Sequence, residues 1–306
     1  MMKEHRPNRI DTEHLRALSK RMPWPWLADA TLDWLIIAAA VIAAMALHHP
    51  FAYLLAVPVI GNRQHALAVL GHDGAHFTLS RSKWLNDGLT NLLAMWPLGL
   101  TVSGYRSLHM KHHKETGTEN DPELMHKAAR APQWDLPASR WTVLKYAAMD
   151  LAGYSLPDYS IIVRFSKPGH PKHLAGLLAF HALLIAALLV SGAWPVLLLW
   201  YGSLFTSFMM FFRLRLWLEH QGTDGTQRVM LNRWQAILLA PHNAWYHYEH
   251  HSWPTVPYHR LPELRRVMDG KPAQSLGELL ACLENAPATL SGEPGRSGSK
   301  GDVAEA

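Results

Sequence analysis

The segment ATLDWLIIAAAVIAAMAL, residues 30–47, decides the fold class because Asp33 is its only charged residue. A helix of roughly 20 apolar residues is long enough to cross the hydrocarbon core of a bilayer. Three more apolar runs of similar length occur later in the chain, and four such runs would be hard to bury in one soluble core. The sequence therefore predicts an all-α membrane protein with four transmembrane helices, at about residues 30–48, 51–71, 174–190 and 194–218.

The distribution of lysine and arginine predicts how these helices are oriented. The link between the first two runs, residues 48–50, and the link between the last two, residues 191–193, contain no Lys or Arg. Residues 78–173 contain 12 of them, and more precede the first run and follow the fourth. By the positive-inside rule, both termini and the long middle segment are cytoplasmic. We therefore expect two hairpins of helices beneath a cytoplasmic helical cap.

Composition divides the chain and excludes some classes of function. We expect a cytoplasmic lead-in at residues 1–29, a membrane domain at 30–284 and a disordered tail at 285–306, which is rich in Gly, Ser, Pro and charge. The single cysteine, Cys282, excludes an intramolecular disulfide and a thiolate-rich metal site. The net charge of +5 suits an anionic lipid surface or an acidic protein partner. No nucleic acid partner is expected, because the basic residues flank the apolar runs.

Three histidine clusters indicate the chemistry: HDGAH at 72–76, HMKHH at 109–113 and HYEHH at 247–251. Helix positions i, i+3 and i+4 share a face, so each cluster is expected to present its imidazoles to a single point. Histidine is abundant, with 20 in 306 residues, but chance does not readily give three such clusters beside apolar segments. Eight imidazoles suit a pair of metal ions. The predicted ligands are His72, His76, His109, His112, His113, His247, His250 and His251.

The type of ligand narrows the choice of metal and reaction. A hydrolytic zinc site needs three ligands and an open position, far fewer than are present. A metal transporter should carry ligands within its spans, where only His65 and His181 lie. A pair of iron ions at the membrane surface would instead suit activation of O2 and attack on an apolar C–H bond, with the metal supplying the difficult step.

With these motifs, the sequence resembles the integral-membrane fatty acid desaturase/hydroxylase superfamily over about residues 30–265. Further matches are RQH at 63–65, LND at 85–87, DP at 121–122 and HSWPTVP at 251–257. The resemblance implies a cofactor of two iron ions (Fe2+/Fe3+), O2 as co-substrate and a ninth ligand, His220, just after the fourth span. The alternative for His220 is a helix C-cap. Leu216 stands where some members have an Asn.

The resemblance also implies a function. The first expectation is a fatty acyl desaturase that inserts a double bond into a lipid acyl chain. Two alternatives stay open: a carotenoid or other lipid hydroxylase or ketolase with the same site, and a His-rich membrane metal-binding or transport protein. The HPGG motif of a fused haem domain is absent from the sequence. Electrons are therefore expected from a separate carrier such as ferredoxin, and the enzyme is expected to be multi-pass, with a cytoplasmic active site.

A few polar and aromatic residues carry expectations of their own. Arg63 is costly within a span, so it should pair with Asp87 or a lipid head group. Three carboxylates adjoin proposed ligands and either orient histidines or are solvated: Asp73, Glu219 and Glu249. Three tryptophans near the first span are expected to form an interfacial belt: Trp24, Trp26 and Trp34.

Overall fold

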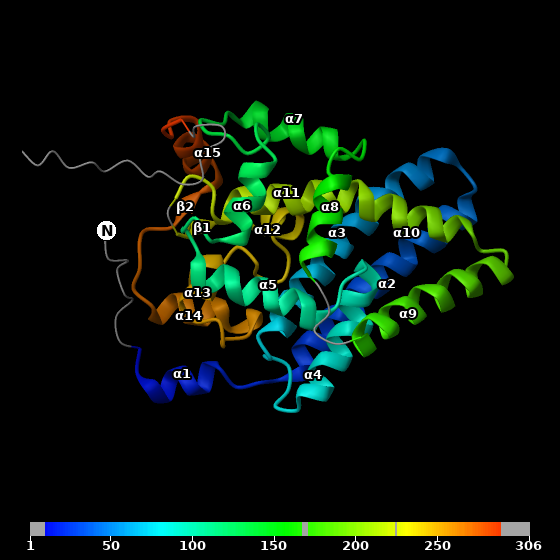
Figure 1. The fold of residues 1–306 in the computed structure, drawn as a ribbon, viewed down its shortest axis with the longest axis horizontal. Coiled ribbons are helices and arrows are strands. Elements are labelled where there is room, and N and C mark those ends of the chain that lie inside the picture. Colours follow the sequence, from blue (N-terminus) through cyan, green and yellow to red (C-terminus); the bar gives the residue numbers. More distant parts are fainter. Residues whose placement is uncertain (1–9, 167–170, 224, 289–306) are drawn as a thin grey trace, which may run out of the picture.

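The structure is a computed structural model that describes residues 10–166, 171–223 and 225–288 (Figure 1). Most of the expected tail, from residue 289 onward, and residues 1–9 of the lead-in lie outside the described residues. The first half of the chain forms helices α1 (Thr12–Leu18), α2 (Pro23–Leu47), α3 (Pro50–Ala75), α4 (Lys83–Thr90), α5 (Val102–Glu115), α6 (Pro122–Ala129) and α7 (Arg140–Asp150). Between α4 and α5 lie a π-helical turn, Asn91–Met95, and a 3-10 turn, Trp96–Leu98.

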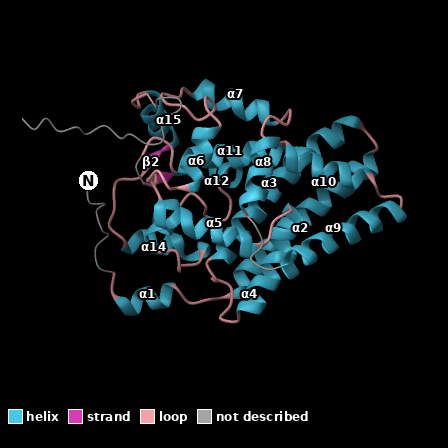
Figure 2. Ribbon diagram, in the orientation of Figure 1, coloured by secondary structure: helices cyan, strands magenta, loops and turns pink. Residues whose placement is uncertain are grey.

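The second half is also helical. It contains α8 (Leu156–Phe165), α9 (Pro171–Val190), α10 (Pro195–Phe205), α11 (Ser207–Glu219), α12 (Arg233–Leu239), α13 (His247–Ser252), a 3-10 turn at Tyr258–Arg260, α14 (Leu261–Val267) and α15 (Leu276–Glu284). The strands β1 (Val229–Met230) and β2 (Gln274–Ser275) form one short parallel pair within the described residues (Figure 2). The expectation of a mostly helical protein is confirmed.

Among the described residues, three segments are long and apolar enough to span a membrane: Thr12–Leu47, which contains α2, then α9, and Pro195–Glu219, which contains α10 and α11. These correspond to the first, third and fourth predicted spans. The second predicted span, 51–71, is a helix of sufficient length, α3. Its second half, however, carries buried polar residues such as Asn62, Gln64 and His65. A four-span arrangement therefore stays a prediction.

The long apolar helices begin at proline. Pro23, Pro50, Pro171 and Pro195 are the first residues of α2, α3, α9 and α10. Proline has no N–H to leave unpaired in a first turn, and its fixed φ suits the helix. The links between paired helices are short, with only His48 and His49 between α2 and α3.

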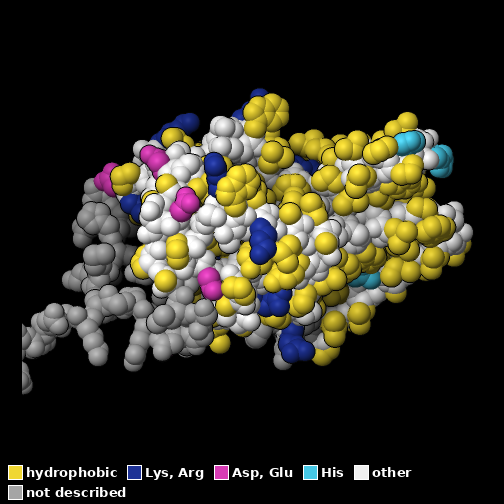
Figure 3. All heavy atoms as spheres, turned by 90° about the horizontal axis from the view of Figure 1, so that it is seen from above, with side chains coloured by type: hydrophobic (Ala, Val, Ile, Leu, Met, Phe, Trp, Pro, Cys, Tyr) yellow, Lys and Arg dark blue, Asp and Glu magenta, His cyan; other side chains and the backbone are white. Residues whose placement is uncertain are grey.

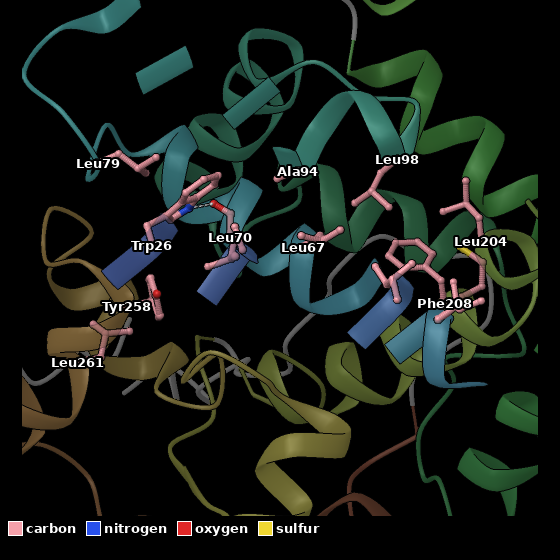
Figure 4. Packing of buried hydrophobic residues seen from close by; sticks show 14 of the residues in the cluster. Trp26, Leu67, Leu70, Leu79, Ala94, Leu98, Leu204, Phe208, Tyr258 and Leu261 are labelled. Atoms are coloured by element: carbon pink, nitrogen blue, oxygen red, sulfur yellow. Dashed lines mark hydrogen bonds between the residues drawn. The ribbon is translucent and has the colours of Figure 1, made fainter. Parts of the chain in front are cut away.

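Helix α3 lies at the centre of the molecule and packs against α2, α10 and α11. Leu67 and Leu70 of α3 are fully buried in the main hydrophobic core, with Leu204 of α10 and Phe208 of α11 (Figure 4). Gly61 of α3 allows α3 and α11 to approach closely. A Cβ there would lie 2.6 Å from the backbone nitrogen of Phe208. Ser207 and Phe208 directly follow Thr206, the residue at which the predicted fourth span is interrupted between α10 and α11.

Of the three tryptophans expected at the membrane interface, Trp26 belongs to the core instead, and Trp34 is half-buried against it. Trp26 is 1% exposed and donates from Nε1 to the Leu70 carbonyl at 3.0 Å. Trp34 stacks on Trp200 at 5.4 Å and donates to a backbone carbonyl of the π-helical turn. Trp24 alone is exposed. Partners for the buried indole N–H groups explain the difference, because they let these side chains leave the surface.

The expected partner of Arg63 was also wrong. Its guanidinium lies 3.0 Å from Asp33 of α2, whereas Asp87 pairs with Arg106 of α5 at 2.6 Å. Asp33 is fully buried, and it also accepts a contact from His242 Nε2 at 2.7 Å. The charge inside the first apolar run is therefore compensated by another helix, which makes it tolerable there.

The molecular surface is uneven in polarity. Hydrophobic side chains cover the half of the molecule formed by α2, α9 and α10, on the right in Figure 3, while charged side chains gather toward the other half. Large exposed apolar residues on those helices include Leu35, Leu183 and Leu198. Extended apolar surface of this kind is unusual for a soluble monomer and is typical of contact with lipid.

Candidate metal centre

Four helices deliver the predicted ligands to one place. His72 lies in the last turn of α3 and His76 at its C-cap, four residues later. Helix α5 carries HMKHH and α13 carries HYEHH, both in helical conformation. His220 follows α11 directly and occupies its C-cap. All nine predicted residues converge, although they come from segments that lie up to about 180 positions apart in the sequence.

The nine imidazoles divide into two groups. Within each group, all the ligand nitrogens lie within 4.8 Å of one another. The first group consists of His72, His76, His109, His113 and His250. The second group consists of His112, His220, His247 and His251. The two groups are adjacent, because the rings of His113 and His251 stack at 4.1 Å.

The division corrects the expectation that each cluster points its imidazoles at a single point. In α5, His109 and His113 join the first group, while His112 joins the second. In α13 the pattern is reversed, since His250 belongs to the first group and the flanking pair to the second. Successive residues are about 100° apart around a helix, so the i+3 and i+4 side chains diverge enough to reach two separate centres.

The nitrogen atoms within each group approach to hydrogen-bond distance. Nε2 of His109 lies 2.9 Å from Nε2 of both His76 and His113. In the second group, Nε2 of His220 lies 2.8 Å from Nε2 of His247 and 3.1 Å from that of His112. A protonated ring nitrogen could serve only one such contact, so converging sets of five and four imidazoles fit cations between them.

Two histidines of the second group have an acceptor beside Nδ1, the nitrogen opposite Nε2. Nδ1 of His112 lies 2.8 Å from the Asp121 carboxylate, and Nδ1 of His220 lies 2.9 Å from the Gly225 carbonyl. When Nδ1 carries the proton and donates it, Nε2 keeps its lone pair for a metal. His220 therefore occupies the C-cap of α11 and also has the orientation expected of a ligand. From the sequence, these two roles were alternatives.

Burial keeps most of these imidazoles neutral at physiological pH. It lowers the pKa of His76 to about 3, with a further contribution from Arg106, and it lowers the pKa of His113 to about 3. The pKa of His220 falls to about 4 for the same reason. Neutral imidazole is the form that binds metals. The exception is His112, where hydrogen bonding to Asp121 and nearby negative charge outweigh burial and raise the pKa.

The three carboxylates beside the clusters are buried and have partners. The alternative that they are solvated was therefore wrong. Asp73 accepts from the Tyr258 backbone N–H at 3.0 Å. Glu219 lies 3.3 Å from Nδ1 of His247, a histidine distant in sequence, and pairs with Arg215 at 2.6 Å. Glu249 faces away from the histidines.

Glu249 instead holds the helix of the third cluster in place. It lies 2.6 Å from Arg228 and 2.8 Å from Arg265, and it is fully buried. Arg265 lies on α14, so this carboxylate links α13 to the helix that follows it. A residue next to a ligand on a helix points elsewhere, and here it serves to anchor the helix.

Asp121 belongs to the DP motif at 121–122, but the sequence did not reveal its contact with His112. It is the N-cap of α6 and accepts from the Glu123 backbone N–H at 2.9 Å, while its carboxylate also faces His112. The signal in the sequence was Asp-Pro-Glu, a typical helix start. The second contact could not be found that way, because it depends on how α5 and α6 pack.

A cavity of about 590 Å3 opens beside both groups. His72 and His109 of the first group and His112 and His247 of the second line it. Much of the remaining wall is apolar and includes Phe212 of α11. Its volume is within the range of small-molecule binding sites. The centre can therefore meet a hydrophobic molecule held in this cavity.

The chain is similar to a family of known proteins and to several of their relatives. The family model for fatty acid desaturases matches residues 48–278. A beta-carotene ketolase of Paracoccus sp. (strain PC1) is 24% identical over 252 residues, which cover 80% of this chain and 88% of the relative. An sn-1 acyl-lipid omega-3 desaturase (ferredoxin) of Nostoc sp. (strain 36) is 36% identical over 75 residues, 24% of this chain and 21% of the relative.

An sn-1 oleoyl-lipid 12-desaturase of Picosynechococcus sp. is 33% identical over 90 residues, 28% of this chain and 26% of the relative. The matches to the two desaturases thus span about a quarter of those proteins' length, whereas the match to the ketolase spans most of both chains.

Proposed function

Because this chain belongs to the fatty acid desaturase family and is an oxidoreductase, we propose that it inserts a double bond into a lipid acyl chain with O2 as co-substrate. The observation that carries the proposal is the convergence of nine buried or half-buried imidazoles beside an apolar cavity. Such a site suits removal of hydrogen from hydrocarbon. The family and its relatives do not favour the metal-transport alternative.

We propose that two iron ions occupy the centre, one in each group of histidines. His72, His76, His109, His113 and His250 would hold the first, and His112, His220, His247 and His251 the second. All-imidazole sites suit iron among other transition metals. Bound iron would supply the reaction with O2 that breaks an unactivated C–H bond.

The residues of the chain would orient the ligands and the substrate. Asp121 would accept from Nδ1 of His112, and Glu219 lies 3.3 Å from Nδ1 of His247, so both carboxylates would help to aim the Nε2 atoms at the centre. Phe212 and other apolar residues of the cavity exclude water from the carbon that reacts. The cavity wall contains histidines of both groups, so a chain lying along it would pass both proposed ions.

A second candidate function is favoured by one specific observation. The ketolase match extends over most of both proteins, while the desaturase matches are local. Oxidation of a carotenoid or other lipid to a hydroxyl or keto product would use the same site. The products separate the candidates, because desaturation adds no oxygen atom to the lipid.

We propose that α2, α3, α9 and the α10–α11 segment form four spans in two hairpins, with both termini and the histidines in the cytoplasm. The apolar surface over α2, α9 and α10 and the absence of Lys and Arg from the two short links support this. Electrons would come from a separate acidic carrier such as ferredoxin, attracted by the basic cytoplasmic segments.

The test is to express the chain in a host and analyse its lipids, carotenoids included, with and without His250→Ala. We expect a new unsaturated acyl product that depends on O2, and about two irons per purified chain. His250→Ala should abolish the product and reduce the iron content, since its Nε2 lies 3.1 Å from that of His113. His14→Ala, at an exposed position on α1, is the control and should leave both unchanged. Full activity in His250→Ala would contradict the proposal.

A further inference from the structure

The two groups of histidines offer unequal numbers of ligands. Five imidazoles converge in the first group and four in the second, so the second ion would have one histidine fewer than the first. Non-haem iron commonly combines imidazole nitrogen with carboxylate oxygen as ligands. A carboxylate placed on the correct side of the second group could therefore complete it.

Three carboxylates lie close to the second group, and they face different nitrogens. Asp121 lies beside Nδ1 of His112. Glu219 lies beside Nδ1 of His247. Glu123 instead has its Oε2 atom 3.9 Å from Nε2 of His112, the nitrogen that approaches another imidazole of the same group. Of these three carboxylates, Glu123 is the one on the side of its histidine where the ion would lie.

The distance between Glu123 and His112 suits two ligands of one ion. Bonds from a metal to imidazole nitrogen or carboxylate oxygen are about 2.1 Å long, so two ligand atoms lie about 3 Å apart at a right angle and about 4.2 Å apart on opposite sides of the ion. The separation of 3.9 Å falls in the wide part of this range. Glu123 lies at the edge of the group, because it is not among the residues whose ligand atoms all lie within 4.8 Å of one another. A small rotation of its side chain would bring Oε2 to the ion.

The position of Glu123 on α6 leaves Oε2 available. The other oxygen, Oε1, lies 2.7 Å from Nζ of Lys127, one helical turn later. This buried lysine compensates the charge of the carboxylate and holds the side chain beside α5. The side chain of Glu123 is 19% exposed and lines the cavity together with His112 and His247, so its free oxygen is not enclosed by the protein.

We infer that Glu123 is a tenth ligand of the metal centre and binds the second ion through Oε2. The inference rests on the proposed function, in which four imidazoles hold this ion. Each ion would then have five protein ligands, and among the residues assigned here the second ion alone would have a negatively charged one. A negative charge at bonding distance stabilises the more highly charged ion, so the ferric state would be favoured in the second group. The competing role for Glu123 is that of an ion-pair partner for Lys127 and nothing more.

The test is an anaerobic titration of the purified full-length apo-protein in detergent with Fe2+, which gives the number of sites and the affinity of each. Removing a residue that merely orients a ligand typically costs about 10- to 100-fold in affinity, so removing a ligand should cost at least about tenfold. We expect Glu123→Gln, which keeps the size of the side chain, to weaken one of the two sites by that factor and to preserve the other. Unchanged affinity at both sites would overturn the inference.

Glu115→Gln is the matched control. Glu115 also has a half-buried side chain, 23% exposed, and it also pairs with a lysine, Lys114, at 3.6 Å. It belongs to neither group of ligands and does not line the cavity. The control variant should bind Fe2+ at both sites like the unaltered protein. A loss equal to that in Glu123→Gln would show a general effect of removing negative charge and contradict the assignment.

Two further variants separate a ligand from a charge and from an ion-pair partner. Glu123→His supplies a neutral ligand, so it should restore most of the affinity that Glu123→Gln loses. Histidine could not replace a carboxylate that acted only by its charge or only by pairing with Lys127. Lys127→Gln removes the competitor for the carboxylate and should leave the affinity of the second site unchanged or higher. Equal losses in Lys127→Gln and Glu123→Gln would reduce Glu123 to a partner of Lys127, and this comparison remains decisive if Glu123→His does not fold.

Product formation in the same preparations separates this inference from the proposed function. Loss of one site in Glu123→Gln and its rescue by Glu123→His, in a protein that oxidises no lipid, would support the ligand and refute the proposed reaction. Oxidation of lipids by a protein whose affinity for Fe2+ is the same in Glu123→Gln would refute the ligand and leave the oxidoreductase in place.

Discussion

Asp121 joins two tasks in a single side chain, because it caps α6 and faces Nδ1 of His112. We predict that Asp121→Asn separates them. Asparagine is as good an N-cap as aspartate, so the helix should remain stable. The neutral amide polarises the imidazole less, and iron binding to the second group should weaken about 10- to 100-fold. Titration of the purified protein with Fe2+ measures the change.

The control for this change is Asp11→Asn. Asp11 caps α1 in the same way, by accepting from the His14 backbone N–H at 3.1 Å, but it is exposed and has no contact with the proposed ligands. It should leave the affinity for iron unaltered. Equal affinity in Asp121→Asn and in the unaltered protein would show that Asp121 serves only as a cap.

At the scale of single residues, spacing in the sequence indicated which histidines come together but not which side chains contact them. Spacing on a helix is a local property, so HMKHH and HYEHH could be read directly. The partners are not local. Glu219 contacts His247, and Arg63 finds Asp33 rather than Asp87, because packing of helices far apart in sequence decides both. The assignment of imidazoles to two groups depends on the same packing.

At the scale of elements, α11 is placed by its close contact with α3. Gly61 faces Ser207 and Phe208, and a Cβ at Gly61 would overlap the Ser207 hydroxyl oxygen. We predict that Gly61→Ala forces the two helices apart and displaces His220 at the far end of α11. The variant should lose about 1–3 kcal/mol of stability, the usual cost of overpacking. Both Tm and the iron content should fall.

Gly202→Ala is the matched control, because Gly202 is helical and a Cβ there would meet nothing within 4 Å. Its Tm should be unchanged or slightly higher, since alanine favours the helix. A Gly61→Ala protein with unaltered Tm and iron content would show that α3 and α11 can adjust without moving the site.

The loop before α13 is fixed by charge. His242 lies there, with Nε2 2.7 Å from Asp33 and Nδ1 3.5 Å from Asp29, both on α2. Burial by itself would lower the pKa of His242, but the two carboxylates outweigh it and raise the pKa to about 9. Arg63 on α3 also contacts Asp33, and Tyr258 donates to Asp29.

This raised pKa gives stability a dependence on pH. Protonated His242 stabilises the fold fully below the unfolded-state pKa of about 6.5, and that contribution is lost as pH rises through about 9. The shift corresponds to about 3 kcal/mol. We predict that Tm in detergent falls between pH 7 and 10, and that His242→Gln lowers Tm at pH 7 and removes most of that fall. His14→Gln, at an exposed position, should keep the normal profile. An identical profile in His242→Gln would rule out this histidine as the source.

At the scale of the whole molecule, the apolar runs predicted where the long helices lie. They did not predict which faces of those helices pack against the protein. In the part of the chain that the structure describes, three segments have the length and composition of spans. Helix α3 is different, since its second half buries polar side chains against its neighbours and carries His72 at its end. A hydropathy pattern cannot distinguish a residue that faces lipid from one that faces the protein, which is why it predicts a surface position for the buried Trp26.

The proposed topology can be tested with the single native cysteine. Cys282 is exposed on α15, so a charged, membrane-impermeant maleimide should be able to react with it. In the proposed topology, the reagent would reach it only from the cytoplasm. We predict that intact host cells leave Cys282 unlabelled and that opened cells label it fully. The matched variant is Ser191→Cys in a Cys282→Ser background, which places the thiol in the exposed link between α9 and α10. It should be labelled in intact cells, because the helices on either side of this link carry it across the apolar core. Labelling of both thiols from outside would contradict the positive-inside assignment, and with it a cytoplasmic electron donor.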